Sequence, residues 1–282
     1  MRRNSPEIHP LAGAIGAEVS GVDLGGEVDD DTIAAIRRAW LDHLVIFLRD
    51  QSLPPARFLA FARRFGEPIE YPFVKGIDGF PEITPVVKLE HERVNFGGLW
   101  HTDTAYLEIP PMGTMLIARE VPPYGGDTLF ANQYLAYDTL SAGMKTMLSG
   151  LRAVHTDRLV AGPAANRNAH RSTKVRQGDD WRETINLHPV VRTHPETGRK
   201  LLNVNAAYTV GFEDMTEEES KPLLQYLLAH GHRPEFTCRF RWEKGSVAFW
   251  DNRAVKHLAI HDAGPHLRLM RRVQVCGDRP YE

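Results

Sequence analysis

The chain has 282 residues, of which 42% are hydrophobic and 25% charged, as is usual for a soluble globular protein. The formal net charge is −2 and no long basic stretch is present, so nucleic acid is not predicted as a partner. No apolar run approaches the roughly 20 residues that a membrane span requires. The two cysteines lack zinc-ligand spacing, so neither a disulfide framework nor a structural zinc is predicted. A cytoplasmic location fits these features best.

Helical and strand patterns alternate in the first quarter of the chain. The Gly- and Val-rich residues 15–24 predict a strand and a turn. Residues 30–43 predict a helix, because Ile33, Ile36 and Trp40 recur at three- and four-residue steps behind an acidic start. The apolar residues 44–48 then predict a buried strand. A second helix is predicted from about Pro55 to Phe65, ended by Gly66.

Short β-type runs separated by loops dominate the remainder. They span residues 114–118, 201–204, 247–250 and 269–276. A third helix is predicted to begin at a capping box formed by Thr216 and Glu219, to run to about His230, and to be capped by Gly231. The polar residues 159–183 predict a loop or lid. We therefore expect one domain over residues 1–282, mainly β with flanking helices.

A histidine and a carboxylate one residue apart occur in Trp100-His101-Thr102-Asp103, and a second histidine, His257, follows far downstream. This pattern matches the 2-His-1-carboxylate facial triad, which binds Fe(II) and leaves positions open for other ligands. His-x-Asp alone is weak, since about one or two His-x-Asp/Glu triplets are expected by chance from the composition. Indeed, residues 155–157 and 194–196 carry rival triplets.

Two arginines strengthen the metal hypothesis. Arg268 and Arg272 are predicted to share one face of the last strand, since alternate residues of a strand point the same way. Buried guanidinium groups are costly unless each meets an anion. Four residues correspond to roughly 13 Å at about 3.3 Å per residue, so the two arginines could hold two separate anions around one metal. The alternative is a pair of surface arginines on an edge strand.

Over nearly its full length the chain resembles the taurine/2,4-D (TauD/TfdA-type) dioxygenases that depend on Fe(II) and 2-oxoglutarate. The resemblance implies a double-stranded β-helix (jelly-roll) core. It implies that His101, Asp103 and His257 bind the iron, that Thr128 and Arg268 hold 2-oxoglutarate, and that Arg272 contacts a substrate anion. The motifs that carry it are residues 15–24, Trp100-His101-Thr102-Asp103, Gly125-Gly126-Asp127-Thr128, Trp250-Asp251-Asn252-Arg253 and Gly277-Asp278-Arg279-Pro280.

The resemblance also implies the reaction. Oxidative decarboxylation of 2-oxoglutarate with O2 would yield succinate and CO2 and would hydroxylate a small organic anion. Asp103 points to hydroxylation, because related halogenases have a small residue at this position. A homodimer or homotetramer is compatible with the family.

The resemblance leaves the substrate open among sulfonates, alkyl sulfates and phenoxyalkanoates. Taurine-specific members place a histidine where this chain has Tyr71, which argues against taurine. Tyr71, Trp100 and Tyr208 are expected to line an aromatic substrate pocket, although simple core packing would also explain the two tyrosines.

Two other functions remain open at this stage. The same ligands could serve a metal-dependent hydrolase in which a metal-bound water is the nucleophile. The chain could also be a non-catalytic jelly-roll protein that binds a small anion.

Overall fold

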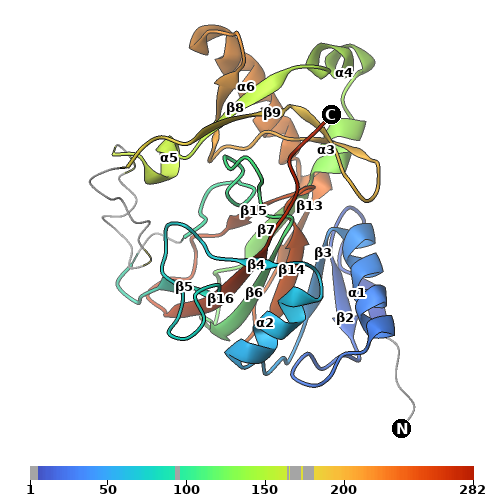
Figure 1. Ribbon diagram of the computed structural model, residues 1–282, viewed down its shortest axis with the longest axis vertical. Coiled ribbons are helices and arrows are strands. Elements are labelled where there is room, and N and C mark those ends of the chain that lie inside the picture. The colour runs from blue at the N-terminus through green and yellow to red at the C-terminus, as the bar shows by residue number, and fades with distance from the viewer. Residues whose placement is uncertain (1–5, 93–95, 164, 166–172, 174–180) are drawn as a thin grey trace.

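The structure, a computed structural model, describes residues 6–92, 96–163, 165, 173 and 181–282. Its centre is an eight-stranded sheet (Figure 1). In spatial order the strands are β1 (Glu7–Pro10), β2 (Ala17–Ser20), β3 (Val45–Leu48), β14 (Val247–Asp251), β6 (Gly113–Glu120), β16 (Arg268–Val275) and β4 (Pro68–Ile69), with β5 (Thr84–Lys88) also paired to β16. The predicted mainly β class with flanking helices is confirmed.

A three-stranded sheet faces the large sheet and completes the jelly-roll core. It contains β13 (Thr237–Phe240), β7 (Thr128–Asn132) and β15 (Val255–Ala259). Aromatic rings fill the space between the sheets. The Phe47 ring stacks on that of Phe240, with 3.9 Å between the ring centroids, and it meets the Phe130 ring edge-on, with 5.6 Å between the centroids. This apolar layer holds the two sheets face to face, which sets the position of β15.

Helices cover the outer face of the large sheet. They are α1 (Asp30–His43), which lies beside β2, β3 and β14, and α2 (Pro55–Arg63), which packs on β16 and β4 (Figure 1). Trp40 stacks on Phe249 of β14 at 4.4 Å, while the next residue, Trp250, contacts Phe130 between the sheets. Neighbouring residues of one strand thus serve two cores, as alternation requires. The predicted bounds of the first helix are confirmed, with Asp29 as its N-cap.

The remaining elements form a layer beyond the small sheet. They are α3 (Gln133–Asp138), α4 (Ala142–Leu148), α5 (Arg158–Ala161), α6 (Glu217–Gly231), the 3-10 helix η2 (Pro234–Phe236), the sheet of β12 (Thr209–Phe212), β8 (Arg152–Thr156) and β9 (Ile185–Pro189), and the pair β10 (Val191–Thr193) and β11 (Lys200–Leu202). The capping box at Thr216 is confirmed. The predicted C-cap is wrong by one residue, because Gly231 still belongs to α6 and His232 caps it.

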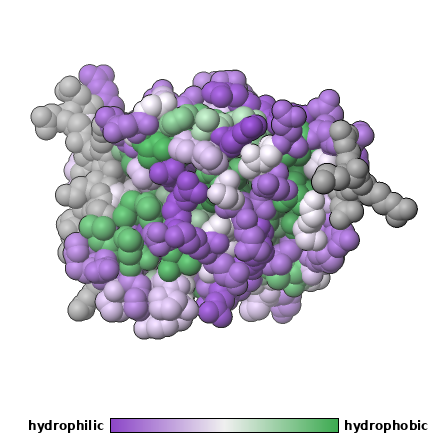
Figure 2. Space-filling model, turned by 90° about the horizontal axis from the view of Figure 1, so that it is seen from below, coloured by the Kyte–Doolittle hydropathy of each residue, from purple (hydrophilic) through white to green (hydrophobic). Residues whose placement is uncertain are grey.

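The surface interleaves hydrophilic and hydrophobic residues, as the view from below shows (Figure 2). Among the described residues, no helix is both long enough and apolar enough to span a bilayer. The predicted lid over residues 159–183 falls largely outside the described residues and stays a prediction.

Candidate metal centre

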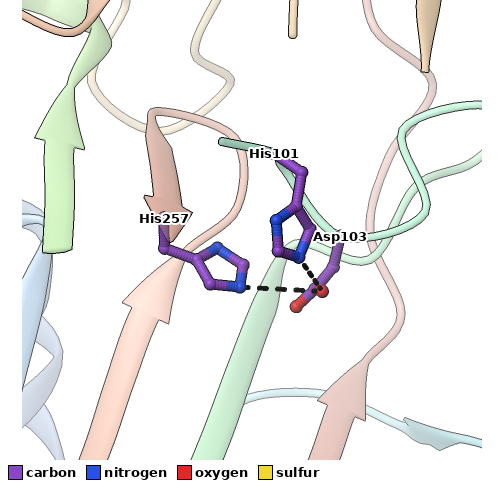
Figure 3. Close-up of side chains that lie close together, drawn as sticks. All are labelled: His101, Asp103 and His257. Carbon is purple, nitrogen blue, oxygen red and sulfur yellow. Dashed lines mark ion pairs between the residues drawn. The ribbon is translucent and has the colours of Figure 1, made fainter. Parts of the chain in front are cut away.

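Three side chains with metal-ligand atoms lie together beside β15: those of His101, Asp103 and His257. Their ligand atoms all lie within 4.8 Å of one another. Nε2 of His101 is 3.5 Å, and Nε2 of His257 is 3.9 Å, from Oδ1 of Asp103. Figure 3 shows the two imidazole rings and the carboxylate directed at one common point. The sequence-predicted triad therefore comes together in space, and neither rival His-x-Asp/Glu triplet joins it.

Backbone pairing places the two histidines side by side. The His101 N–H donates to the His257 carbonyl at 3.1 Å, and the His257 N–H donates to the His101 carbonyl at 2.8 Å. On its other side β15 pairs with β7, so that His257 lies opposite Phe130. His257 thus lies on a strand of the small sheet. The segment that carries His101 and Asp103 is hydrogen-bonded to that strand.

The protonation of His101 suits a metal ligand. Its Nδ1 lies 2.6 Å from the carbonyl oxygen of Leu99. Because a carbonyl can only accept, Nδ1 carries a proton, and in the neutral imidazole this tautomer has its lone pair on Nε2. Proteins usually fix the tautomer of a metal-binding histidine by such a hydrogen bond from the ring nitrogen that does not bind the metal.

Charges and burial also favour metal-binding protonation states in the other two candidate ligands, Asp103 and His257. Burial alone would raise the pKa of Asp103, but the His257, His101 and Arg272 groups outweigh it and hold that pKa far below its usual range. Burial and the neighbouring His101 lower the pKa of His257 to about 3. The carboxylate is therefore ionised and the imidazole neutral at neutral pH. Two neutral imidazoles and one carboxylate are a donor set suited to Fe(II).

Arg268 and Arg272 both face the same pocket as the triad, as predicted from strand alternation. They are 4% and 5% exposed, which excludes the surface-arginine alternative. Nε of Arg268, and Nε and Nη2 of Arg272, are buried and have no hydrogen-bond partner among the described residues. Nη1 of Arg272 lies 3.4 Å from Oδ1 of Asp103. Burial lowers the pKa of Arg268 to about 10, which still leaves it charged at neutral pH. Two buried cations with unused donors favour two anionic ligands.

Thr128 lines the same pocket from the start of β7. The indole N–H of Trp242 donates to its hydroxyl oxygen at 2.9 Å. Since an indole can only donate, the Thr128 proton stays available for an acceptor in the pocket. Thr128 and Arg268 thus present donors to the same space.

Three tyrosine side chains lie near Arg272, and one of them, Tyr71, contacts it directly. The Tyr71 ring lies 4.2 Å from the Arg272 guanidinium carbon, and Tyr208 packs against Tyr106 at 5.1 Å. The hydroxyl of Tyr106 is buried without a partner in the described structure. Burial, with Tyr71 and Tyr208 nearby, raises the pKa of Tyr106 well above its usual range, so its hydroxyl can donate. Tyr106 was missed from sequence, although it lies three residues after Asp103.

Trp100 is placed elsewhere. Its ring stacks on that of His232 at 4.6 Å, and it does not line the pocket that contains the triad. It immediately precedes His101, whose side chain points into the site, and successive residues of an extended segment face opposite ways. The role expected of Trp100 in the substrate pocket stays a prediction.

Comparison with known proteins agrees with this geometry. The family model described as taurine catabolism dioxygenase TauD, TfdA family matches residues 7–274. An alpha-ketoglutarate-dependent sulfate ester dioxygenase of Pseudomonas putida is 35% identical over 97% of this chain and 90% of the relative. An (S)-phenoxypropionate/alpha-ketoglutarate dioxygenase of Sphingobium herbicidovorans is 30% identical over 96% of this chain and 95% of the relative.

A solved structure extends the likeness to the fold. A taurine dioxygenase from Burkholderia xenovorans superposes with a TM-score of 0.83 at 38% identity and covers 98% of this chain and 91% of its own. These three proteins thus represent the three substrate types that the sequence leaves open.

Proposed function

Because this chain belongs to the TauD/TfdA family and is an Fe(II)- and 2-oxoglutarate-dependent dioxygenase, we propose that it oxidises a small organic sulfate ester or sulfonate. His101, Asp103 and His257 are the proposed iron ligands. Thr128 and Arg268 are the proposed contacts of the distal carboxylate of 2-oxoglutarate. The observation that carries the proposal is the second buried arginine, Arg272, which keeps two unpartnered nitrogens close to the triad.

The donors around Arg272 suit a tetrahedral sulfur oxyanion. Its Nε and Nη2 can donate two parallel bonds to two oxygens of one anion. The hydroxyl of Tyr106 supplies a further donor for a third oxygen, which a sulfate ester or sulfonate has and a carboxylate lacks. The sulfate ester dioxygenase relative supports this choice. Tyr71 and Tyr208 are proposed to border the substrate beside Arg272.

A bound ferrous ion with 2-oxoglutarate supplies the activation of O2 for this reaction. Hydroxylation of the carbon that bears the sulfate gives a hemiacetal sulfate, R–CH(OH)–OSO3⁻, in which the bond between this carbon and the bridging sulfate oxygen then breaks. The overall balance is R–CH2–OSO3⁻ plus 2-oxoglutarate plus O2 to R–CHO, sulfate, a proton, succinate and CO2. The chain's own residues hold the sulfate group and orient the adjacent carbon toward the metal, which is the contribution of positioning to catalysis.

The test is substrate-dependent succinate release with Fe(II), 2-oxoglutarate and air. A panel of alkyl sulfates, taurine and phenoxypropionates separates the three substrate types. We expect an alkyl sulfate to stimulate succinate release most, with one sulfate freed per succinate. Preference for a phenoxypropionate would replace the proposed substrate class. Sulfate release without O2 and 2-oxoglutarate would indicate the hydrolase instead, and no stimulation by any compound would favour the non-catalytic binding protein.

The two arginines provide a matched pair of variants for separating the two anion sites. In Arg272→Ala we expect the substrate KM to rise roughly 30-fold or more, because removing one partner of a buried charge pair costs about 2–5 kcal/mol. The KM for 2-oxoglutarate should change little. In Arg268→Ala, by contrast, the KM for 2-oxoglutarate should rise and the KM for the substrate should change little. Equal effects on both KM values in either variant would contradict the assignment, and Mn(II) titration of both variants checks that the metal site persists.

A further inference from the structure

The two oxygens of the Asp103 carboxylate have different surroundings. Oδ1 faces Nε2 of His101 and Nε2 of His257. Oδ2 instead accepts a 2.7 Å hydrogen bond from the hydroxyl of Thr114, on β6. Only Oδ1 is therefore directed toward the point at which the three ligands converge.

A chain of hydrogen bonds with a fixed direction leads to this carboxylate. The Trp250 indole N–H donates to Oδ1 of Asn252 at 2.9 Å. Because an indole can only donate, the amide oxygen of Asn252 must face it, and the amide NH2 faces Thr114, donating to its hydroxyl oxygen at 2.7 Å. The hydroxyl has one proton, which is then left for Asp103. Trp250 thus acts through Asn252 on the direction of the Thr114 proton, and Nε2 of Gln274 also donates to the Thr114 hydroxyl oxygen, at 3.5 Å.

The residues of this hydrogen-bond series are buried. The exposed fractions of Thr114, Asn252, Trp250 and Asp103 are 0%, 2%, 2% and 3%. Thr114 lies on a strand paired on both sides, with Trp250 opposite it on β14 and Gln274 opposite it on β16. The Trp250 ring also packs against His257 at 4.6 Å. Hydrogen bonds in such a setting are stronger than in water, and a free oxygen there would be costly.

We propose that Thr114 and Asn252 are positioning residues that keep Asp103 a one-oxygen metal ligand. This inference rests on the proposed metal site. With Oδ2 held by Thr114, the carboxylate cannot rotate to offer both oxygens. A two-oxygen ligand would take a coordination position that the co-substrate requires. The hydrogen bond also fixes the orientation of the ligand before the metal binds.

The test is the affinity of the full-length protein for Mn(II), measured without substrate by the EPR signal of free Mn(II). Thr114→Val keeps the shape of the side chain but removes the donor. We expect its Kd to rise about 10- to 100-fold, the usual effect of losing an outer hydrogen-bond partner of a metal ligand. Thr114→Ser restores the hydroxyl and should return the Kd to near the wild-type value.

A control variant separates this effect from general loss of a buried hydroxyl. Thr156 is also fully buried, and its hydroxyl donates to the carboxylate of Glu183 at 2.6 Å, outside the triad. Thr156→Val should leave the Mn(II) Kd unchanged. Thermal melts of the metal-free variants show whether each has folded. If Thr114→Val does not fold, Asn252→Ala removes the 2.7 Å donor to Thr114, leaves only the 3.5 Å contact from Gln274, and should still raise the Kd several-fold.

The outcomes distinguish this inference from the proposed function. Wild-type protein that binds no Mn(II) would contradict the metal site itself. Wild-type binding together with an unchanged Kd in folded Thr114→Val, or in Asn252→Ala, would overturn the positioning role and leave the metal site standing. A raised Kd that Thr114→Ser does not correct would also overturn it, because the hydroxyl would not be the cause.

Discussion

Replacing Asp103 by alanine is expected to abolish 2-oxoglutarate-dependent O2 uptake while leaving the fold intact. Asp103 supplies the only carboxylate of the triad, and its Oδ1 is the atom that both imidazoles face. The Mn(II) Kd should rise by more than about 100-fold, since even outer partners of metal ligands account for 10–100-fold. Oxygen-electrode traces and Mn(II) titration measure the two effects. Near-normal turnover in this variant would refute the assignment of the metal site.

The rival His-x-Asp triplet supplies the control. Asp157 also follows a histidine by two residues, but it accepts hydrogen bonds from the Trp181 indole and the Thr184 backbone and does not join the triad. Asp157→Ala should retain Mn(II) binding close to that of the wild type. Loss of binding in both variants would mean that the Asp103 result reflects unfolding, which circular dichroism would reveal.

The second large effect concerns stability rather than chemistry. Asp251 is completely buried and accepts two bonds from the Arg253 guanidinium, at 2.8 and 2.7 Å. His194 adds a third bond at 3.0 Å. Removing one member of such a buried pair leaves an uncompensated charge. Arg253→Met should therefore lower the free energy of unfolding by about 3–5 kcal/mol in urea titrations.

Arg37 is the matched control, because it pairs with the same Glu196 that Arg253 also reaches. The Arg37 side chain is 35% exposed, so Arg37→Met should cost less than about 1 kcal/mol. Equal decreases in the free energy of unfolding of the two variants would show that the buried network does not contribute more to stability than the exposed ion pair.

The network also gives a pH dependence with a definite sign. Burial would raise the pKa of Asp251, but Arg253 and His194 outweigh it and hold that pKa well below its ordinary 3.8. A depressed pKa contributes stability above the unfolded value and loses it as the pH falls toward the folded value. The stability gap between wild type and Arg253→Met should thus narrow below pH 3.8.

From the sequence alone, the candidate metal ligands and the two arginines of the pocket could be predicted. Metal chemistry restricts ligands to few residue types, so His101, Asp103 and His257 are recognisable by type and motif. Alternation along a strand predicts that Arg268 and Arg272 share a face, and both prove buried. Local signals also located the first helix, whose cap and periodicity lie within its own residues. The helix and the shared strand face depend on neighbours in the chain, which the sequence displays directly.

The surroundings of those residues could not be predicted from the sequence. Thr114 meets Asp103 because β6 lies between β14 and β16, and Asn252 reaches Thr114 from the turn after β14. The Trp100 ring stacks on that of His232, whereas the unpredicted Tyr106 packs on Tyr208. These contacts depend on the register and packing of strands that are distant in sequence. A one-residue shift in register would reverse every face, and no local pattern records that choice.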